Sequence, residues 1–225
     1  GKNTQMPATS PLAERMRPQK IEDLAGQEHL TGQGSMLRTA LEKGKIPSIL
    51  LWGPPGTGKT SLVRALAQEA DLPVYAYDLS TLDNEDFNSA WMDMQANAPC
   101  VALIEDVDGV FKGRENVVSG SDMRGGLSFD CLLNAIGGIQ TADGVAVFIT
   151  TNQPEHLDPA LVRPGRVDRI FTLGLPTEHQ RESIIARILG NCPADHLNAT
   201  QGLSAAETTE WAVSKALHDK WNSVS

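Results

Sequence analysis

The chain has 225 residues, of which 40% are hydrophobic and 21% are charged, and its formal net charge is −9. This length allows one sizeable core with a small appendage, and the composition is ordinary for a globular protein. The negative charge disfavours nucleic acid as the main partner, because proteins that bind it over a broad surface are usually basic. No apolar run approaches the roughly 20 residues that span a bilayer, so we expect no membrane span.

Cysteine usage indicates the compartment. Cys100, Cys131 and Cys192 are far apart in the sequence, and neither they nor the five histidines have the spacing of a metal site. An odd, scattered set of cysteines is typical of a reducing environment. We therefore expect free thiols that pack as small hydrophobes, and a cytoplasmic location or another reducing compartment.

Short apolar segments alternate with helical patterns from Ser48 onward. Strands are expected at residues 48–52, 73–78, 101–104, 145–151 and 170–173. This alternation predicts a doubly wound, parallel α/β sheet of five strands. Asp158 followed by Pro159 predicts the start of a short helix. The Gly-, Ser- and charge-rich residues 112–126 predict a long exposed loop.

After Pro176 the pattern is helical only. Thr177 with Gln180, and Ser204 with Glu207, have the spacing of two capping boxes, each preceding a helix with one apolar face. We therefore expect a disordered lead-in at residues 1–14, an α/β domain at 15–175, and a small helical lid domain at 176–225.

GPPGTGKT at residues 53–60 matches the phosphate-binding P-loop pattern G-x-x-x-x-G-K-[ST], and it lies between an expected strand and an expected helix. In such a loop the backbone amides surround phosphates, aided by the helix N-terminus. Lys59 would reach the β- and γ-phosphates of ATP, and the Thr60 hydroxyl would bind Mg²⁺. The predicted nucleotide-binding residues here are Gly53, Pro54, Pro55, Gly56, Thr57, Gly58, Lys59, Thr60 and Ser61.

VALIEDVD at residues 101–108 is an apolar strand that ends in carboxylates. In P-loop enzymes an acid at the end of a neighbouring strand holds Mg²⁺ and a second acid activates water. We therefore assign Glu105 to the metal, together with Thr60, and Asp106 to the attacking water.

TTNQPEHLDPALVRPGRVDRIF at residues 150–171 completes a set of motifs that resembles the AAA+ ATPases, in particular the AAA group with a second region of homology. The resemblance covers nearly the whole chain. It implies that Asn152 orients the attacking water, and that Arg163 and Arg166 are arginine fingers. In that family such arginines enter the site of a neighbouring subunit and stabilise transition-state charge. A ring is therefore implied, specifically a hexamer.

Two segments resemble different subfamilies. MRPQKIEDLAGQEHL at residues 16–30 is similar to the linker of clamp-loader and recombination-type ATPases, which packs on adenine, so Leu24, Ala25 and Gly26 are candidate nucleotide contacts. IEDVD and GLSFDCLLNAIGGI resemble instead the mitochondrial AAA chaperones that move a folded Rieske iron–sulfur protein. Both relationships stay open.

The acids depart from the usual order, which is Asp followed by Glu. Glu105 is one methylene longer at the metal position, and Asp106 is withdrawn from the water by about 1.5 Å, one C–C bond. Because a general base must first be within reach, slow turnover is one consequence. The chaperone group named above has the same inversion, so the order is compatible with activity.

Two further departures bear on the biological role. YDLSTLDNEDFN at residues 77–88 lacks the aromatic–apolar–Gly triplet of unfoldase pore loops, and GLSAAE at 202–207 resembles the AAA lid rather than a clamp-loader lid with a sensor arginine. These features favour an ATP-hydrolysing ring that remodels or activates an unknown protein client. The alternative is a DNA-transaction ATPase of clamp-loader or recombination type. The inverted acids alone would fit a third hypothesis, a scaffold that binds nucleotide without hydrolysing it.

Overall fold

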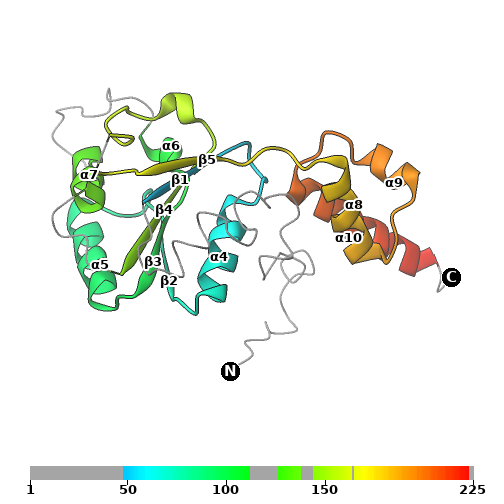
Figure 1. Ribbon diagram of the computed structural model, residues 1–225, viewed down its shortest axis with the longest axis horizontal. Coiled ribbons are helices and arrows are strands. Elements are labelled where there is room, and N and C mark those ends of the chain that lie inside the picture. Colours follow the sequence, from blue (N-terminus) through cyan, green and yellow to red (C-terminus); the bar gives the residue numbers. More distant parts are fainter. Residues whose placement is uncertain (1–47, 112–125, 138–143, 164, 223–225) are drawn as a thin grey trace.

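The computed structural model describes residues 48–111, 126–137, 144–163 and 165–222 (Figure 1). Its sheet has five parallel strands in the spatial order β2-β3-β4-β1-β5. The strands are β1 (Ile49–Trp52), β2 (Val74–Tyr77), β3 (Cys100–Ile104), β4 (Val145–Thr151) and β5 (Arg169–Thr172). The predicted fold class, a doubly wound parallel sheet of five strands followed by a helical segment, is confirmed.

Helices cover both faces of this sheet (Figure 1). In chain order they are α4 (Lys59–Glu69), α5 (Asn84–Ala96), α6 (Val107–Val110), α7 (Phe129–Gly137), the 3₁₀ helix η3 (Pro154–His156), α8 (Glu178–Leu189), α9 (Ala194–Ala199) and α10 (Ala205–Asn222).

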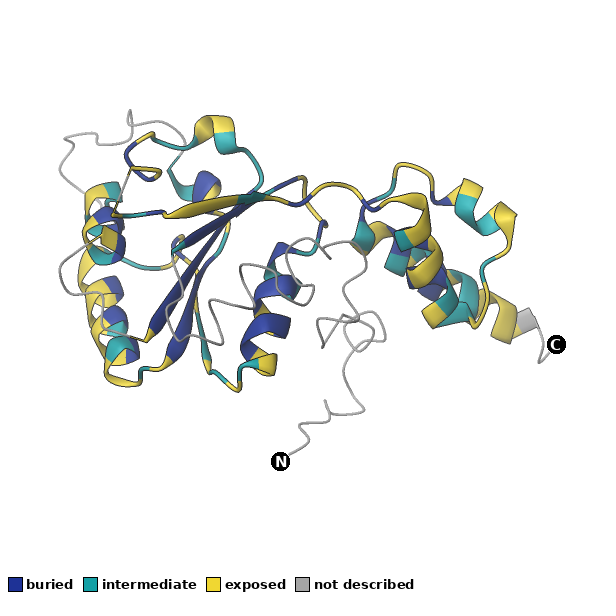
Figure 2. Cartoon of the chain, in the orientation of Figure 1, coloured by how far each residue is buried: buried dark blue, intermediate teal, exposed yellow. Residues whose placement is uncertain are grey.

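Alternate residues of each strand face opposite layers. Ile49 and Leu51 of β1 pack with α4, whereas Leu50 between them packs with the cluster formed by α5, α6 and α7. The central strands β3 and β4 are buried along their whole length (Figure 2). Strands buried on both faces read as continuous apolar runs, which is why both were recognisable in the sequence.

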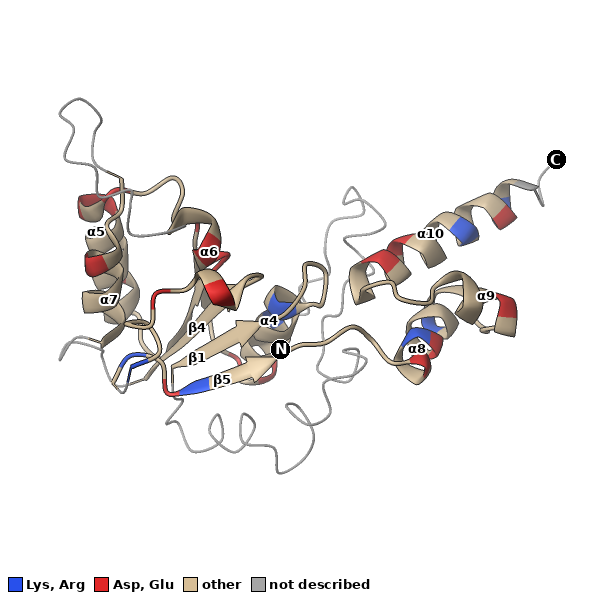
Figure 3. Cartoon of the chain, turned by 90° about the horizontal axis from the view of Figure 1, so that it is seen from above, with Lys and Arg blue, Asp and Glu red and all other residues tan. Residues whose placement is uncertain are grey.

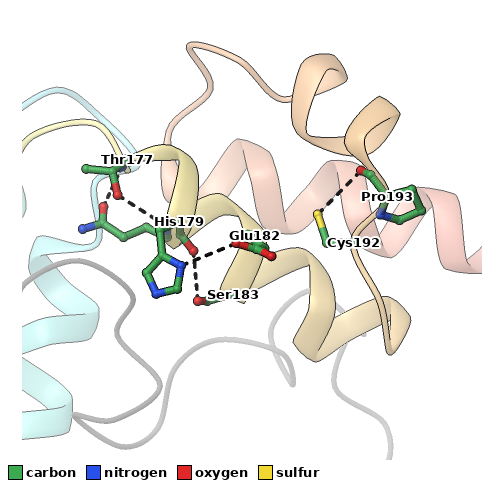
Figure 4. Close-up of polar contacts among 7 residues, drawn as sticks. Thr177, His179, Glu182, Ser183, Cys192 and Pro193 are labelled. Atoms are coloured by element: carbon green, nitrogen blue, oxygen red, sulfur yellow. Dashed lines mark hydrogen bonds and ion pairs between the residues drawn. The ribbon is translucent and has the colours of Figure 1, made fainter.

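The helices α8, α9 and α10 follow β5 and lie to one side of the sheet (Figure 1). Both predicted capping boxes are confirmed. At the start of α8 the Thr177 hydroxyl accepts from the Gln180 N–H while the Gln180 side chain accepts from the Thr177 N–H (Figure 4). Before α10, the Ser204 N–H donates to Glu207 (2.8 Å) and the Glu207 N–H donates to Ser204 Oγ (3.2 Å). The exact domain limits stay a prediction.

The helix predicted at Asp158 and Pro159 is wrong. Asp158 does cap, because its Oδ1 accepts from the Ala160 N–H (2.7 Å), but residues 159–162 form turns and no helix, and the first turn is closed by the Leu161 N–H on the Asp158 carbonyl. A second turn would need an N–H from residue 164, which is proline and has none. The Ala160 carbonyl accepts instead from the guanidinium of Arg166 (2.8 Å).

Short elements escaped the sequence reading, namely α6, η3 and α9. The long loop predicted at 112–126 lies almost wholly outside the described residues. No helix within the described ranges is long and apolar enough to cross a membrane.

Candidate functional site

Polar side chains gather where β1, β3 and β4 end, because parallel neighbours bring their carboxyl ends to the same edge of the sheet. We call this region the nucleotide edge and define it by Lys59, Thr60, Glu105, Asp106 and Asn152. Figure 3 shows the charged positions of α4 and α6 from above the molecule.

The loop between β1 and α4 holds the predicted P-loop residues. Its first residue must be glycine, because a Cβ on Gly53 would collide with the Leu173 carbonyl. Pro54, Pro55 and Gly56 are exposed, whereas Thr57 is buried and donates to the Pro54 carbonyl (2.9 Å).

Lys59 is the first residue of α4, and only 7% of it is exposed. Its ammonium donates to the carbonyl oxygens of Gly53 (2.8 Å) and Pro54 (3.2 Å), and to Asn152 Oδ1 (2.8 Å). Burial lowers the pKa of Lys59, and the negative charges of Asp106 and Asp108 oppose that shift. The loop thus folds around a buried cation.

Thr60 and Glu105 meet across the gap between α4 and the end of β3. The Thr60 hydroxyl donates to Glu105 Oε1 over 2.6 Å. This contact places two hard oxygen atoms side by side, the type of ligand that Mg²⁺ prefers. Within the described part of the chain, His, Cys, Asp and Glu form no cluster of three or more that could hold a metal. Mg²⁺ in proteins usually keeps several waters and takes substrate phosphate oxygens beside one or two protein ligands.

Asp106 lies beside Asn152 rather than beside Thr60. Its backbone has a φ of 48°, in the left-handed region that Asp tolerates better than most residues. The Asp106 N–H donates to Thr150 Oγ1 (3.0 Å), and its Oδ1 accepts from Asn152 Nδ2 (3.0 Å). Since Asn152 also accepts from Lys59, the amide joins the lysine to the exposed carboxylate.

Asp108 is a polar residue of this region to which the sequence reading gave no role. It is buried in α6, with 6% exposed, and its Oδ1 accepts from Thr151 Oγ1 (2.7 Å) and from the Asn152 N–H (3.0 Å). Its sequence signal was an acid set among Val107, Gly109 and Val110 directly after the strand.

The two predicted arginine fingers lie on the segment that follows η3. Arg163 is exposed, and its side chain makes no hydrogen bond or ion pair with the described residues, although its carbonyl accepts from the Arg166 N–H (3.2 Å). Arg166 is half-buried and donates from Nη1 to the Ala160 carbonyl (2.8 Å), and its Cγ would be 2.6 Å from a Cβ placed on Gly137. Neither arginine is bonded to the nucleotide edge of its own chain.

The residues that lead into α10 touch the P-loop. The Ala206 N–H donates to the Gly56 carbonyl (3.0 Å), and the Ser204 side chain lies against Gly56. The small residues of GLSAAE thus lie next to the predicted phosphate loop. The candidate adenine contacts Leu24, Ala25 and Gly26 lie outside the described residues.

Comparison with known families agrees with this geometry. Residues 49–175, more than half of the chain, match the family described as "ATPase family associated with various cellular activities (AAA)". The chain therefore belongs to the AAA family of ATPases, and the resemblance stated from its motifs is confirmed.

Individual relatives include proteins of both eukaryotes and bacteria. The chain is 43% identical to "Probable mitochondrial chaperone bcs1" of Schizosaccharomyces pombe over 154 residues, which cover 66% of this chain and 33% of the relative. It is 35% identical to "ATP-dependent zinc metalloprotease FtsH 2" of Symbiobacterium thermophilum over 193 residues, covering 78% and 33%. With FtsH of Haemophilus influenzae the identity is 39% over 155 residues, covering 63% and 24%. The chain thus spans a third or less of these relatives' length.

Proposed function

We propose that this chain is the ATP-hydrolysing part of a ring-forming AAA protein, a hexamer, that remodels or activates a protein client. The observation that carries the hydrolytic part is the continuous set of contacts from Lys59 through Asn152 to Asp106, beside the Thr60–Glu105 pair. These are the groups needed to hold a triphosphate, a divalent cation and a water at one edge of a sheet.

Nucleotide binding starts with the P-loop. In this structure the Lys59 ammonium donates to the carbonyl oxygens of Gly53 and Pro54. The β- and γ-phosphate oxygens of ATP are charged and would be stronger acceptors. The N-terminus of α4 contributes its free N–H groups to the same anion.

Thr60 and Glu105 suit Mg²⁺, since their oxygen atoms already lie 2.6 Å apart. When bound, that ion neutralises part of the phosphate charge. The inverted order of the acids is consistent with this role: the longer Glu105 reaches Thr60, while Asp106 turns toward Asn152.

In the proposed reaction a water oxygen forms a bond to the γ-phosphorus, and the bond from that phosphorus to the β–γ bridging oxygen breaks. The electron pair of the broken bond leaves with ADP, and the water proton passes to the Asp106 carboxylate. Asn152 holds Asp106 and Lys59 in register. Arg163 and Arg166 would act on the γ-phosphate of the neighbouring subunit, because neither is bonded to its own nucleotide edge.

Coupling to a client would pass through the lid. The hydrogen bond from Ala206 to Gly56 ties the first turn of α10 to the phosphate loop. Loss of the γ-phosphate would therefore alter the lid-to-sheet angle, a movement that can drive a partner.

A protein client is supported by the absence of the pore-loop triplet at residues 77–88, by the net charge of −9, and by the relatives. One relative is named a chaperone and another is named a protease, and both names describe proteins that act on other proteins. The free cysteines fit a reducing compartment, the cytoplasm or another.

A subunit-mixing experiment tests the ring and its shared site. Lys59→Ala removes the phosphate contact and Arg163→Ala removes the residue offered to the neighbour, so each variant alone should be nearly inactive. Mixed hexamers should regain activity, because some interfaces combine an intact P-loop with an intact arginine. The specific activity of the wild type should also rise with protein concentration. Failure of the mixture to regain any activity, with a wild-type rate that is independent of concentration, contradicts the ring.

The client class is tested by stimulation of the ATPase. Stimulation by DNA and by no protein would overturn the remodelling proposal in favour of the DNA-transaction alternative. Absence of DNA binding even at low salt, where phosphate contacts are strongest, would exclude that alternative. Mg²⁺-dependent turnover that Lys59→Ala abolishes would exclude the non-hydrolysing scaffold.

A further inference from the structure

We propose that Asp108 is the positioning residue of the site: its buried carboxylate fixes the backbone at the end of β4, and thereby the direction of the Asn152 amide. This inference rests on the proposed function, since the value of a fixed Asn152 lies in what it holds. The Asp108 carboxylate bonds to the backbone of Asn152 and makes no hydrogen bond with Lys59, Thr60, Glu105 or the Asn152 side chain.

The need for a positioning residue follows from where β4 ends. The last ladder pair on its β3 side joins Ile104 to Ile149, and the last pair on its β1 side joins Trp52 to Thr151. Asn152 is three residues beyond the first of these pairs and one residue beyond the second. Its N–H therefore has no strand partner of that ladder, and it donates instead to Asp108 Oδ1 over 3.0 Å.

The same carboxylate oxygen accepts a second hydrogen bond, from Thr151 Oγ1 over 2.7 Å. Thr151 is fully buried, and its Oγ1 in turn accepts from the Gln153 N–H (3.2 Å). Asp108 thus holds three consecutive residues of the chain, two directly and one through the threonine. Because hydrogen bonds to an ionised, buried carboxylate are among the stronger ones, this turn has little freedom.

A second contact ties the other acid to the same strand. The Asp106 N–H donates to Thr150 Oγ1 over 3.0 Å. The segment carrying Asp106 and Asp108 is therefore bonded to Thr150, Thr151 and Asn152 in succession. These bonds set the distance across which the Asn152 amide meets the Asp106 carboxylate.

The geometry of Asn152 matters because its amide is bifunctional. Oδ1 accepts from Lys59 (2.8 Å) while Nδ2 donates to Asp106 (3.0 Å), so rotation of the side chain would break both contacts. A displacement of about 1 Å in a reacting group can cost on the order of 100-fold in rate. Asp108 also lies close enough to Lys59 for its negative charge to favour the protonated ammonium.

The test compares variants that remove the acceptor with one that keeps it. Asp108→Asn retains a side-chain oxygen at the position of Oδ1 and loses the charge, whereas Asp108→Ala loses both. Thr151→Val removes one donor and Thr151→Ser restores it. We expect Asp108→Ala and Thr151→Val to lower kcat by about 10- to 100-fold, the range for residues that orient an active group. Asp108→Asn and Thr151→Ser should stay within about fivefold of the wild type.

Nucleotide affinity separates positioning from unfolding. The Kd for a fluorescent ADP should change little in all four variants, because none of the altered residues is a predicted phosphate contact. An unchanged kcat in Asp108→Ala overturns the inference. If Asp108→Ala fails to fold, Thr151→Val decides alone: reduced kcat with normal affinity supports the inference, and normal kcat overturns it.

Hydrogen exchange makes the inference independent of hydrolysis. The Asn152 N–H should exchange slowly in the nucleotide-free wild type and at least tenfold faster in Asp108→Ala, and slowly again in Asp108→Asn. If the wild type shows no Lys59-dependent hydrolysis, the proposed function fails and exchange alone decides the role of Asp108. If hydrolysis is present but exchange and kcat are unaffected by Asp108→Ala, only the inference fails.

Discussion

Two regions of the chain supply polar groups to the proposed reaction. They differ in whether their side chains find hydrogen-bond partners within the same chain. At the nucleotide edge every defining side chain has a partner: Lys59 bonds to Asn152, Thr60 to Glu105, and Asn152 to Asp106. On the segment after η3, the Arg163 side chain is exposed and has no partner among the described residues, and the Arg166 side chain bonds only to the Ala160 carbonyl.

This difference indicates which step each region can perform alone. A preorganised set of partnered groups can bind nucleotide within one subunit, because the ordering cost has been met during folding. An exposed cation with no local partner acquires a defined position only when a second surface supplies an anion. We therefore expect binding to be a property of the protomer and fast hydrolysis a property of the assembly.

The largest effect should come from Lys59→Ala. Removing one member of a hydrogen-bonded, buried charge pair costs about 2–5 kcal/mol, or roughly 30- to several-thousand-fold in affinity. Nucleotide binding and hydrolysis should both be lost, measured by fluorescent-nucleotide titration and phosphate release. Arg64→Ala, an exposed position of the same helix, is the matched control and should bind normally. Retained affinity in Lys59→Ala would contradict the assignment of the P-loop.

Arg163→Ala should show most directly that the segment after η3 contributes to hydrolysis and the nucleotide edge to binding. We expect kcat to fall by up to about 10³-fold, as for arginines that stabilise phosphoryl-transfer charge, with nucleotide affinity unchanged. Arg166→Ala should lower kcat too, but also lower the melting temperature, since the Ala160 carbonyl loses its donor and the packing at Gly137 is lost. Equal melting temperatures in both variants would contradict this division of roles.

The nucleotide edge could be predicted from the sequence because its motifs are local. The P-loop pattern fixes Gly53 to Thr60, and β3 and β4 are apolar runs whose ends are visible in the sequence, so Glu105, Asp106 and Asn152 could be placed at one edge. Their meeting then follows from parallel topology alone.

What escaped prediction depends on contacts between distant segments. The role of Asp108 needs Thr151 and Asn152 beside it, more than 40 residues along the chain, and no periodicity reports such a pairing. The turn at Asp158 was misread because the proline at 164 removes the N–H of a second turn and Arg166 takes the free carbonyl. A capping signal at Asp158 and Pro159 gives no information about the donor that a later residue offers to the Ala160 carbonyl.

Exchanging the acids sharpens the comparison within the nucleotide edge itself. The double change Glu105→Asp with Asp106→Glu shortens the arm that reaches Thr60 and lengthens the arm beside Asn152. We expect kcat to change by about tenfold, since general-base efficiency depends on reach, while the Kd for ADP in the absence of Mg²⁺ stays within about threefold. Loss of nucleotide binding with unchanged turnover per bound ATP would contradict the roles assigned to Glu105 and Asp106.

Gly56→Ala tests the contact between the start of α10 and the P-loop. Gly56 has a φ of 76° and its added Cβ would be 2.6 Å from Ser204 Oγ, whereas Gly58 has a φ of 89° with no atom within 4 Å. Gly58→Ala therefore measures the left-handed strain alone, about 1–2 kcal/mol. Gly56→Ala should lower the melting temperature more than Gly58→Ala does. Adding Ser204→Gly to Gly56→Ala should recover this extra loss, because it removes the side chain that the new Cβ would meet. Identical melting temperatures for the two alanine variants would show that the lid contact is dispensable.

The smallest effect is a pH dependence of binding that only Lys59 should cause. Burial lowers the pKa of Lys59 in the free protein, and bound phosphates would raise it. The affinity for nucleotide is therefore highest at pH values below the lowered pKa of free Lys59. It falls as the pH rises from that pKa to the higher pKa of Lys59 in the complex. Stability of the nucleotide-free protein should move oppositely, since between the lowered pKa and the ordinary lysine value the unfolded chain binds more protons. Lys59→Arg, whose guanidinium stays charged, should bind more weakly but with no alkaline decline. A decline of the same size in Lys59→Arg would assign the titration to another group.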